Sequence, residues 1–256
     1  MLNRYFIHLG YKGTQFHGWQ IQPNSITVQE IVNKSLSVLI GEDIATIGAG
    51  RTDTGVHAFS FYAHFDCIQD NIHIKPNFVY KLNCILPKDI VAHRIYLMHP
   101  SAHARFDAIS RTYLYRINQF KDPFNQDLSM QFLKPLNIDQ MNDASSVLKE
   151  YTDFTSFSKL HTDVKTNNCQ IYNAIWNKEG YEIQFTICAN RFLRNMVRAI
   201  VGTLIQVGLG KITIENFRSI IELKNRSDAS ASVDSKGLHL IQIEYPKSYF
   251  SKLEYY

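Results

Sequence analysis

The sequence is poor in cysteine and has no long apolar run. Its four cysteines, Cys67, Cys84, Cys169 and Cys188, are scattered over 256 residues without a Cys-x-x-Cys pair. This pattern indicates neither a disulfide framework nor a zinc knuckle, and it predicts buried thiols. The first residues turn polar before a leader-like apolar segment forms, and no later stretch reaches membrane-spanning length. We therefore expect a cytoplasmic protein that has no membrane span.

Neither sign of charge predominates in the sequence. Lys and Arg number 27 and Asp and Glu 23, so the formal net charge is only +4. Such a small surplus permits a polyanionic partner without indicating one, because nucleic-acid-binding domains are usually more basic. A locally basic cleft has to be judged from the motifs. Hydrophobic residues make up 45% of the chain, which is enough for a substantial core.

Signature motifs of several enzyme classes are incomplete. Gly48 and Gly50 resemble the start of a dinucleotide-binding fingerprint, but the third glycine would fall on Asp53. Gly210-Lys211 lacks the first glycine and the hydroxyl residue of a phosphate-binding loop. No Gly-x-Ser-x-Gly elbow indicates a nucleophilic serine. Oxidoreductase, nucleotide hydrolase and serine hydrolase activities are therefore not indicated.

The sequence also lacks a set of histidines, cysteines or carboxylates with the spacing of metal ligands. His99 and His103 have the i,i+4 spacing of a helical pair, but Pro100 lies between them and no glutamate follows His99. No other set of side chains has the spacing of a metal site. We expect no catalytic metal.

The apolar pattern predicts an α+β protein with mixed, largely antiparallel sheets. Strand-like alternation and helical periodicity recur in loosely the same order in both halves, without repetition of sequence. We expect two similar lobes, residues 1–105 and residues 106–256. The expected strands cover 4–11, 57–66, 90–97, 110–118, 168–177, 181–189 and 237–245. The expected helices cover 28–40, the stretch between Pro76 and Pro87, 138–150, 191–207 and 213–223.

The run Gly50-Arg51-Thr52-Asp53-Thr54-Gly55-Val56-His57-Ala58 is the strongest candidate for a site. A glycine-rich turn in which Asp53 caps backbone amides is the simpler interpretation. Three features favour chemistry: Arg51 lies two residues before the aspartate, glycines permit a ligand to approach the backbone, and an apolar strand follows at once. A carboxylate on a loop held by a rigid strand is a usual catalytic placement.

Asp53-Thr54-Gly55 also matches the catalytic triplet of aspartic proteases. Those enzymes need two carboxylates that share a proton, and this chain has one copy of the triplet. A homodimer could supply the second copy, but Arg51 favours an ionised Asp53 and opposes proton sharing. A protease stays an alternative.

The whole run from Gly50 to Ala58 resembles the catalytic motif of the tRNA pseudouridine synthase A family. Further segments agree with that family in order and spacing, and the likeness covers about residues 4 to 245. These segments are His17–Gln20, Ala104–Ala108, Arg111–Tyr115 and Phe192–Gly202.

The resemblance implies a two-lobed fold whose halves face a central basic cleft, acting as a homodimer without cofactor or catalytic metal. Members of the family convert uridine to pseudouridine at positions 38 to 40 of the tRNA anticodon stem-loop. Asp53 would be the nucleophile, with attack on either the ribose or the base. Tyr113 matches the tyrosine that stacks on the uracil, as an enzyme that extracts a nucleotide requires.

Three arginines and an asparagine are further candidates. Arg191, Arg194, Asn195 and Arg198 form a basic stripe on a helix expected to begin near residue 191. Arg194 suits a solvated position. Arg198 has apolar neighbours and suits a buried partner, hypothetically Asp53, since a guanidinium favours an ionised carboxylate.

The remaining candidates are RNA contacts. Arg51 could orient Asp53 or fill the space left by the extracted base. Arg105, Arg111 and Lys12 are expected phosphate contacts, whose loss would weaken binding and reduce its salt dependence. His57 is expected to bond to backbone and is left out of the catalytic set.

Two further alternatives stay open. The first is a pseudouridine synthase that acts at other tRNA or ribosomal sites. The second is an RNA-binding or RNA-folding protein without turnover, for which Asp53→Asn would change neither binding nor biological effect.

Overall fold

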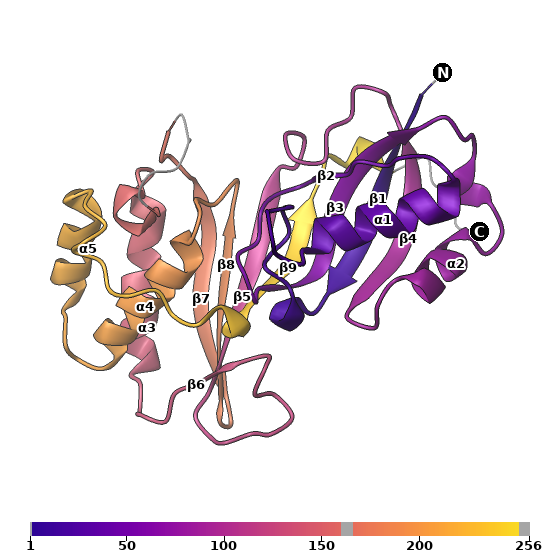
Figure 1. The fold of residues 1–256 in the computed structure, drawn as a ribbon. Helices are drawn as coiled ribbons and strands as arrows, with labels where there is room; N and C mark the ends of the chain where they lie inside the picture. Colours follow the sequence, from indigo (N-terminus) through magenta and orange to yellow (C-terminus); the bar gives the residue numbers. More distant parts are fainter. Residues whose placement is uncertain (1, 160–165, 251–256) are drawn as a thin grey trace. The chain divides into compact units, whose positions relative to one another are not determined.

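The computed structural model describes residues 2–159 and 166–250, and it confirms the expected α+β class. Contacts divide the chain into two compact units. The first comprises the described parts of Met1–Ile109 and Leu240–Tyr256, and the second comprises Ser110–His239. Within the described ranges, no helix is both long enough and apolar enough to cross a membrane. Figure 1 shows the elements in chain order.

The first unit is built on a sheet in which β1 pairs antiparallel with both β3 and β4. The strand order is β4-β1-β3-β9, and the short β2 pairs with β3. The register places Ile7 of β1 opposite Ala63 of β3 and Ile95 of β4. All three side chains are buried, so the centre of β1 is buried between its two neighbours. The strand bounds are β1 Asn3–Tyr11, β2 Ile47–Gly48, β3 His57–Cys67, β4 Ile90–Met98 and β9 Leu238–Glu244, of which residues 240–244 belong to this unit.

Two helices complete the first unit: α1 (Val28–Ile40) packs against α2 (Phe78–Ile85), which packs against β4. Local residues fix both ends of α1. The Thr27 side chain accepts a hydrogen bond from the Glu30 amide, and Gly41 adopts a left-handed conformation with φ 81°. Both helix ends agree with the sequence prediction.

The second unit has the strand order β5-β8-β7. Its pairs β5–β8 and β7–β8 are antiparallel, and β6 pairs with β5 in parallel. Helix α3 packs against β7 and against α4 and α5, so the three helices gather beside β7 (Figure 1). The strands are β5 Ser110–Asn118, β6 Met130–Gln131, β7 Ile171–Glu179 and β8 Glu182–Ala189. The helices are α3 Ile138–Val147, α4 Met196–Gly208 and α5 Ile214–Glu222.

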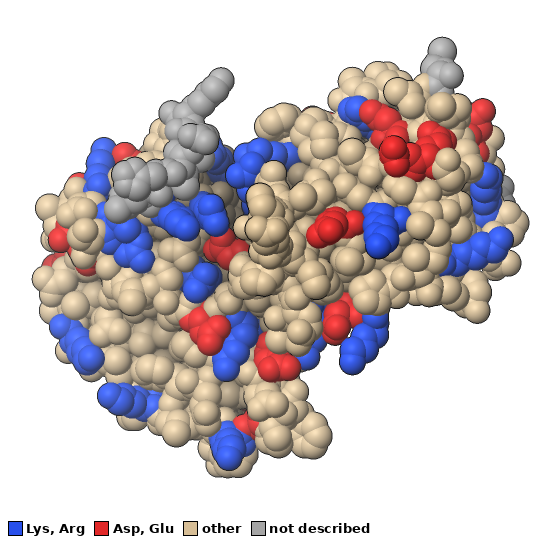
Figure 2. All heavy atoms as spheres, viewed as in Figure 1, with Lys and Arg blue, Asp and Glu red and all other residues tan. Residues whose placement is uncertain are grey.

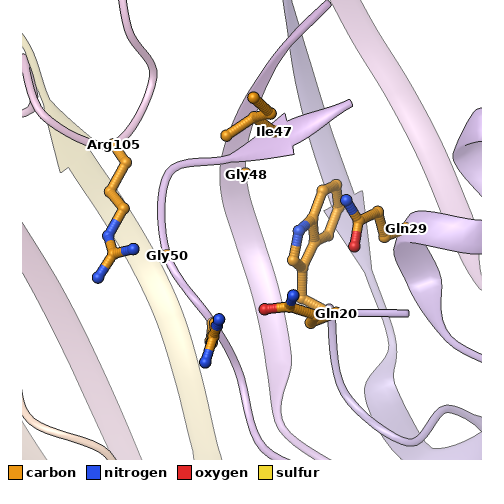
Figure 3. A pocket seen from close by; sticks show the side chains of 8 residues that line it. Gln20, Gln29, Ile47, Gly48, Gly50 and Arg105 are labelled. Atoms are coloured by element: carbon orange, nitrogen blue, oxygen red, sulfur yellow. The ribbon is translucent and has the colours of Figure 1, made fainter. Parts of the chain in front are cut away.

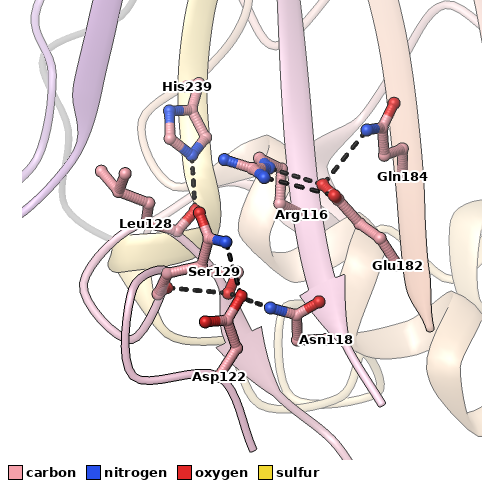
Figure 4. Close-up of polar contacts among 9 residues, drawn as sticks. Arg116, Asn118, Asp122, Leu128, Ser129, Glu182, Gln184 and His239 are labelled. Carbon is pink, nitrogen blue, oxygen red and sulfur yellow. Dashed lines mark hydrogen bonds and ion pairs between the residues drawn. The ribbon is translucent and has the colours of Figure 1, made fainter. Parts of the chain in front are cut away.

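A polar network ties the connector after β5 to the strands (Figure 4). Arg116 donates two hydrogen bonds to Glu182, at 2.6 and 3.2 Å. This guanidinium lowers the pKa of Glu182 from its ordinary value. His239 bonds to the Leu128 carbonyl at 2.7 Å, and Asn118 donates to the Ser129 hydroxyl at 3.2 Å. The Arg116–Glu182 pair joins β5 to β8, and the other two bonds hold the connector, residues 119–129, at Leu128 and Ser129.

Two sequence expectations are wrong. Helix α4 begins at Met196 and not near residue 191, because Asn195 adopts a left-handed conformation with φ 68°. The expected helical stripe through Arg191, Arg194, Asn195 and Arg198 therefore does not exist. Cys84 is exposed, whereas a buried thiol was expected. Phe78 and Leu82 form the buried face of α2, and Cys84 lies two residues beyond Leu82, on the opposite side of the helix.

Candidate active site

Asp53 lies in the loop between β2 and β3. Its side chain is half-buried, between the buried Thr52 and the exposed Thr54. The Val56 amide donates to the Asp53 carbonyl at 3.2 Å, and Gly55 has φ 78°, so the chain turns directly after the aspartate. A tight turn at the start of a long strand gives this carboxylate a defined position.

The segment from Tyr11 to Trp19 is bound along the aspartate loop; we call it the strap. The Tyr11 and Thr52 hydroxyls lie 3.0 Å apart in a buried contact. The Gly55 amide donates to the Phe16 carbonyl at 3.2 Å, and the Trp19 amide donates to the Thr52 carbonyl at 3.3 Å. The strap therefore holds the loop on both sides of Asp53.

Two glycines allow the strap to come this close. A Cβ on Gly13 would lie 1.9 Å from the Val56 carbonyl oxygen, and one on Gly18 would lie 2.3 Å from the Thr52 carbonyl oxygen. Gly18 also has φ 83°. Both positions therefore require glycine. Sequence analysis missed Gly13 and the role of Gly18, and the only local signal was a glycine on each side of an aromatic residue.

His57 has the backbone role that was expected. Its Nδ1 accepts a hydrogen bond from the Gly13 amide at 3.0 Å, and its side chain is buried. This contact joins the strap to the first residue of β3. The prediction that His57 bonds to backbone is confirmed.

A pocket of about 200 Å³ opens next to the aspartate loop (Figure 3). Gln29 is fixed at both ends of its amide, because it accepts from the Ile21 amide at 3.0 Å and donates to the Thr46 carbonyl at 2.6 Å. The pocket thus combines rigid walls with two guanidinium groups. Its lining residues are Trp19, Gln20, Gln29, Ile47, Gly48, Gly50, Arg51 and Arg105.

Arg105 extends from a loop that is held from three sides. The Ala104 amide donates to His64 Nδ1 at 3.2 Å, and the Tyr245 hydroxyl donates to the Ala104 carbonyl at 2.5 Å. The His103 amide donates to Asp107 at 2.6 Å. Burial, with the neighbouring His103, lowers the pKa of His64 to about 4, so this ring is a neutral acceptor at pH 7. The exposed Arg105 therefore stands on a rigid base.

The second unit carries the other candidates on or near β5. Tyr113 is half-buried, and its ring meets the Phe192 ring edge to face at a centroid distance of 5.2 Å. Arg111 donates to the Asn190 carbonyl at 2.9 Å. Tyr115 is fully buried and donates to the Asp234 carbonyl at 2.8 Å, which places it in the core.

Arg198 lies on the first turn of α4 and is half-buried. Its Nε donates to the Val233 carbonyl at 2.8 Å, and the Val233 amide donates back to the Arg198 carbonyl at 3.2 Å. These two bonds to the connection before β9 fix the plane of the Arg198 guanidinium.

Arg194 lies outside the helix and is exposed, as expected for a solvated residue.

The candidates fall into two groups. Lys12, Arg51, Asp53 and Arg105 belong to the first unit; Arg111, Tyr113 and Arg198 belong to the second. The expected pairing of Asp53 with Arg198 joins residues of different units and stays a prediction.

Lys and Arg are interspersed with Asp and Glu on the face drawn in Figure 2. Among the described residues, no group of three or more His, Cys, Asp or Glu side chains could hold a metal ion.

Known proteins resemble the chain over nearly all of its length. Residues 151–246 match the family described as tRNA pseudouridine synthase. The tRNA pseudouridine synthase A of Parabacteroides distasonis is 52% identical over 252 residues, which cover 97% of this chain and 98% of that protein. The one from Bacteroides thetaiotaomicron is 51% identical over 256 residues, covering 98% and 94%. The one from Thermoanaerobacter pseudethanolicus is 39% identical over 238 residues, covering 92% and 96%. The chain therefore belongs to the tRNA pseudouridine synthase A family.

Proposed function

We propose that this protein isomerises uridine to pseudouridine at positions 38 to 40 of the tRNA anticodon stem-loop, with Asp53 as the nucleophile. Family membership makes the chain a pseudouridine synthase, an isomerase that acts on tRNA. The modified positions and the residue roles are our proposal. The main support is the half-buried Asp53 in a loop that the strap holds on both sides.

The proposed reaction breaks one bond and forms another within the same nucleotide. The N1–C1′ glycosidic bond breaks, the uracil turns while it stays bound, and C5 joins C1′. The proton leaves C5 and N1 gains one, so the product is an isomer of the substrate. An ionised Asp53 supplies the electron pair that starts the sequence, by attack on the ribose or on the base.

Tyr113 and Arg51 are proposed to handle the extracted nucleotide. A uridine in a stem-loop is paired or stacked and has to leave its stack before C1′ becomes accessible. The Tyr113 ring, set at a right angle to Phe192, offers a flat surface for the uracil. The exposed Arg51 is proposed to orient Asp53 or to fill the vacated space.

Arg198, Lys12, Arg105 and Arg111 complete the proposed site. The Arg198 guanidinium, with its plane fixed by Val233, is proposed to pair with the Asp53 carboxylate. The other three are proposed phosphate contacts. These roles require that lobes of residues 1–105 and 106–256 face a common basic cleft, which we include in the proposal.

We further propose that the protein acts as a homodimer in the cytoplasm, without cofactor or catalytic metal. The homodimer and the lack of a cofactor or catalytic metal rest on the family resemblance, and the cytoplasmic location rests on the tRNA-related names of its relatives. Family membership argues against the dimeric aspartic protease.

Position-specific tritium release tests the proposal. Unmodified tRNA transcripts carrying C5-tritiated uridine only at position 38, 39 or 40 are incubated with the enzyme. A matched transcript carries the label only at uridines outside the anticodon stem-loop. We expect release from the first group and none from the matched transcript. Release from the matched transcript alone would support a synthase for other sites, and the absence of release from every transcript would support an RNA-binding protein without turnover.

A further inference from the structure

The connection between α5 and β9 contains a braced segment, residues 229–233, which runs along α4 (Figure 1). The Ser230 amide donates to the Thr203 hydroxyl at 3.2 Å, and residue 233 exchanges two hydrogen bonds with Arg198. A Cβ on Gly202 would lie 2.2 Å from the Ala231 carbonyl oxygen. The segment is thus bound to α4 at both ends and lies close to it in the middle.

One side chain from just before the segment braces it. Arg226 is half-buried, and its Nη1 donates to the carbonyls of Ala229 and Ser230, both at 3.1 Å. Its Nη2 donates to the Ser232 hydroxyl at 3.1 Å. A planar guanidinium can hold three acceptors in one fixed arrangement, which an ammonium group cannot do.

The brace reaches the start of α4 through Ser232. The Asn195 side-chain amide donates to the same hydroxyl at 2.6 Å. Asn195 is the left-handed residue from which α4 begins, and Arg198 follows on the first turn. Arg226 therefore contacts the helix start through one shared hydroxyl, and it holds the backbone that leads directly to Val233.

We propose that Arg226 is a positioning residue for the Arg198 guanidinium. It acts by holding residues 229–232, so that the Val233 carbonyl stays in place to accept from Arg198 Nε. This inference rests on the proposed function, because it matters for turnover only if Arg198 serves the isomerisation. The chemical reason is directional: a carbonyl displaced by a fraction of an ångström turns the guanidinium plane that it holds.

The test compares Arg226→Met, Arg198→Met and the double variant in single-turnover tritium release from C5-labelled unmodified tRNA, with tRNA affinity measured by filter binding. We expect Arg226→Met to slow release roughly 10- to 100-fold and to change the tRNA Kd by less than about threefold. Since Arg226 acts through Arg198, the double variant should be no slower than Arg198→Met alone.

Arg218→Met is the matched control. Arg218 is hydrogen-bonded to Glu150 in the same unit, and none of its described hydrogen bonds reaches residues 229–233. It should keep the wild-type rate. If Arg226→Met does not fold, Arg226→Lys replaces it, because lysine keeps the charge and lacks the planar fork of donors that bonds to Ala229, Ser230 and Ser232. We expect the same pattern with a smaller rate loss.

Three outcomes overturn the proposal. A wild-type rate in the active Arg226→Met or Arg226→Lys enzyme shows that the brace does not position Arg198. Losses that multiply in the double variant show that Arg226 acts independently of Arg198. A wild-type enzyme that releases no tritium overturns the proposed function itself, and with it this inference.

Discussion

The Gly13 amide donates a hydrogen bond to Nδ1 of His57, 3.0 Å away in a buried contact. Because Nδ1 is the acceptor, the neutral ring carries its proton on Nε2. The bond joins the strap to the first residue of β3, four positions after Asp53. Together with the contacts of Thr52 and Gly55, it holds the aspartate loop from both ends.

Gly18→Ala should slow isomerisation, whereas Gly41→Ala should not. Both glycines have φ near 80°, so backbone strain alone should make each alanine lower the free energy of unfolding by about 1 kcal/mol. Only at Gly18 does the new Cβ meet the Thr52 carbonyl oxygen, at 2.3 Å, while nothing lies within 4 Å at Gly41. Single-turnover tritium release and thermal melts check both variants. Equal rates in the two variants would contradict the role of the strap.

Tyr113→Leu should slow tritium release by roughly tenfold or more, because a base that stacks on an aromatic ring gains about 1–3 kcal/mol. Tyr113→Phe keeps the ring and should stay close to the wild-type rate. Tyr172→Leu removes an exposed tyrosine from β7 and serves as the control. A Phe variant as slow as the Leu variant would show that the hydroxyl, and not the ring, is what the reaction needs.

Arg105→Gln should weaken tRNA binding and lower the slope of log K against log salt concentration by about one, as expected for the loss of one phosphate contact. The rate at saturating tRNA should not change. Binding measured from low to moderate salt checks the slope. Arg218→Gln, which removes a charge paired with Glu150, is the control. An unchanged slope in Arg105→Gln would remove this residue from the RNA surface.

Acid should destabilise the protein between pH 6.5 and about 4. Burial, with the neighbouring His103 and Arg4, lowers the pKa of His64 to about 4, and burial also lowers the pKa of His8 to about 4. In this range the unfolded chain binds protons at these rings and the folded chain does not, so the free energy of unfolding falls as the pH falls.

His64→Asn should make this pH dependence shallower, because Oδ1 can accept from the Ala104 amide in place of Nδ1 and does not titrate. Denaturant melts at several pH values from 7 to 4 measure the slope. His99→Asn, at an exposed histidine bonded to Ser101, should leave the slope as it is. If His64→Asn keeps the wild-type slope, His64 is not one of the groups responsible.

Local signals predicted most of the fold. Thr27 and Gly41 made both ends of α1 predictable, because a helix cap depends on neighbouring residues alone. The start of α4 escaped prediction, because the apolar periodicity continues back to Phe192 and the turn at Asn195 depends on Ser232, 37 residues away. Propensity cannot register such a contact.

The sequence allowed prediction of the candidate site residues, but not of the residues that hold them in place. The run around Asp53 was identifiable by its residue types and by resemblance. The roles of Gly13 and Gly18 depend on backbone carbonyls about 40 residues further along the chain. Long-range backbone contacts leave no periodic pattern in a sequence.

The central claim is that one ionised aspartate starts the isomerisation, and Asp53→Asn tests it most directly. Asparagine has nearly the same size and lacks the charge. We expect the variant to bind unmodified tRNA with an affinity close to that of the wild type and to release no tritium from C5-labelled uridine. Tritium release at the wild-type rate would contradict the account.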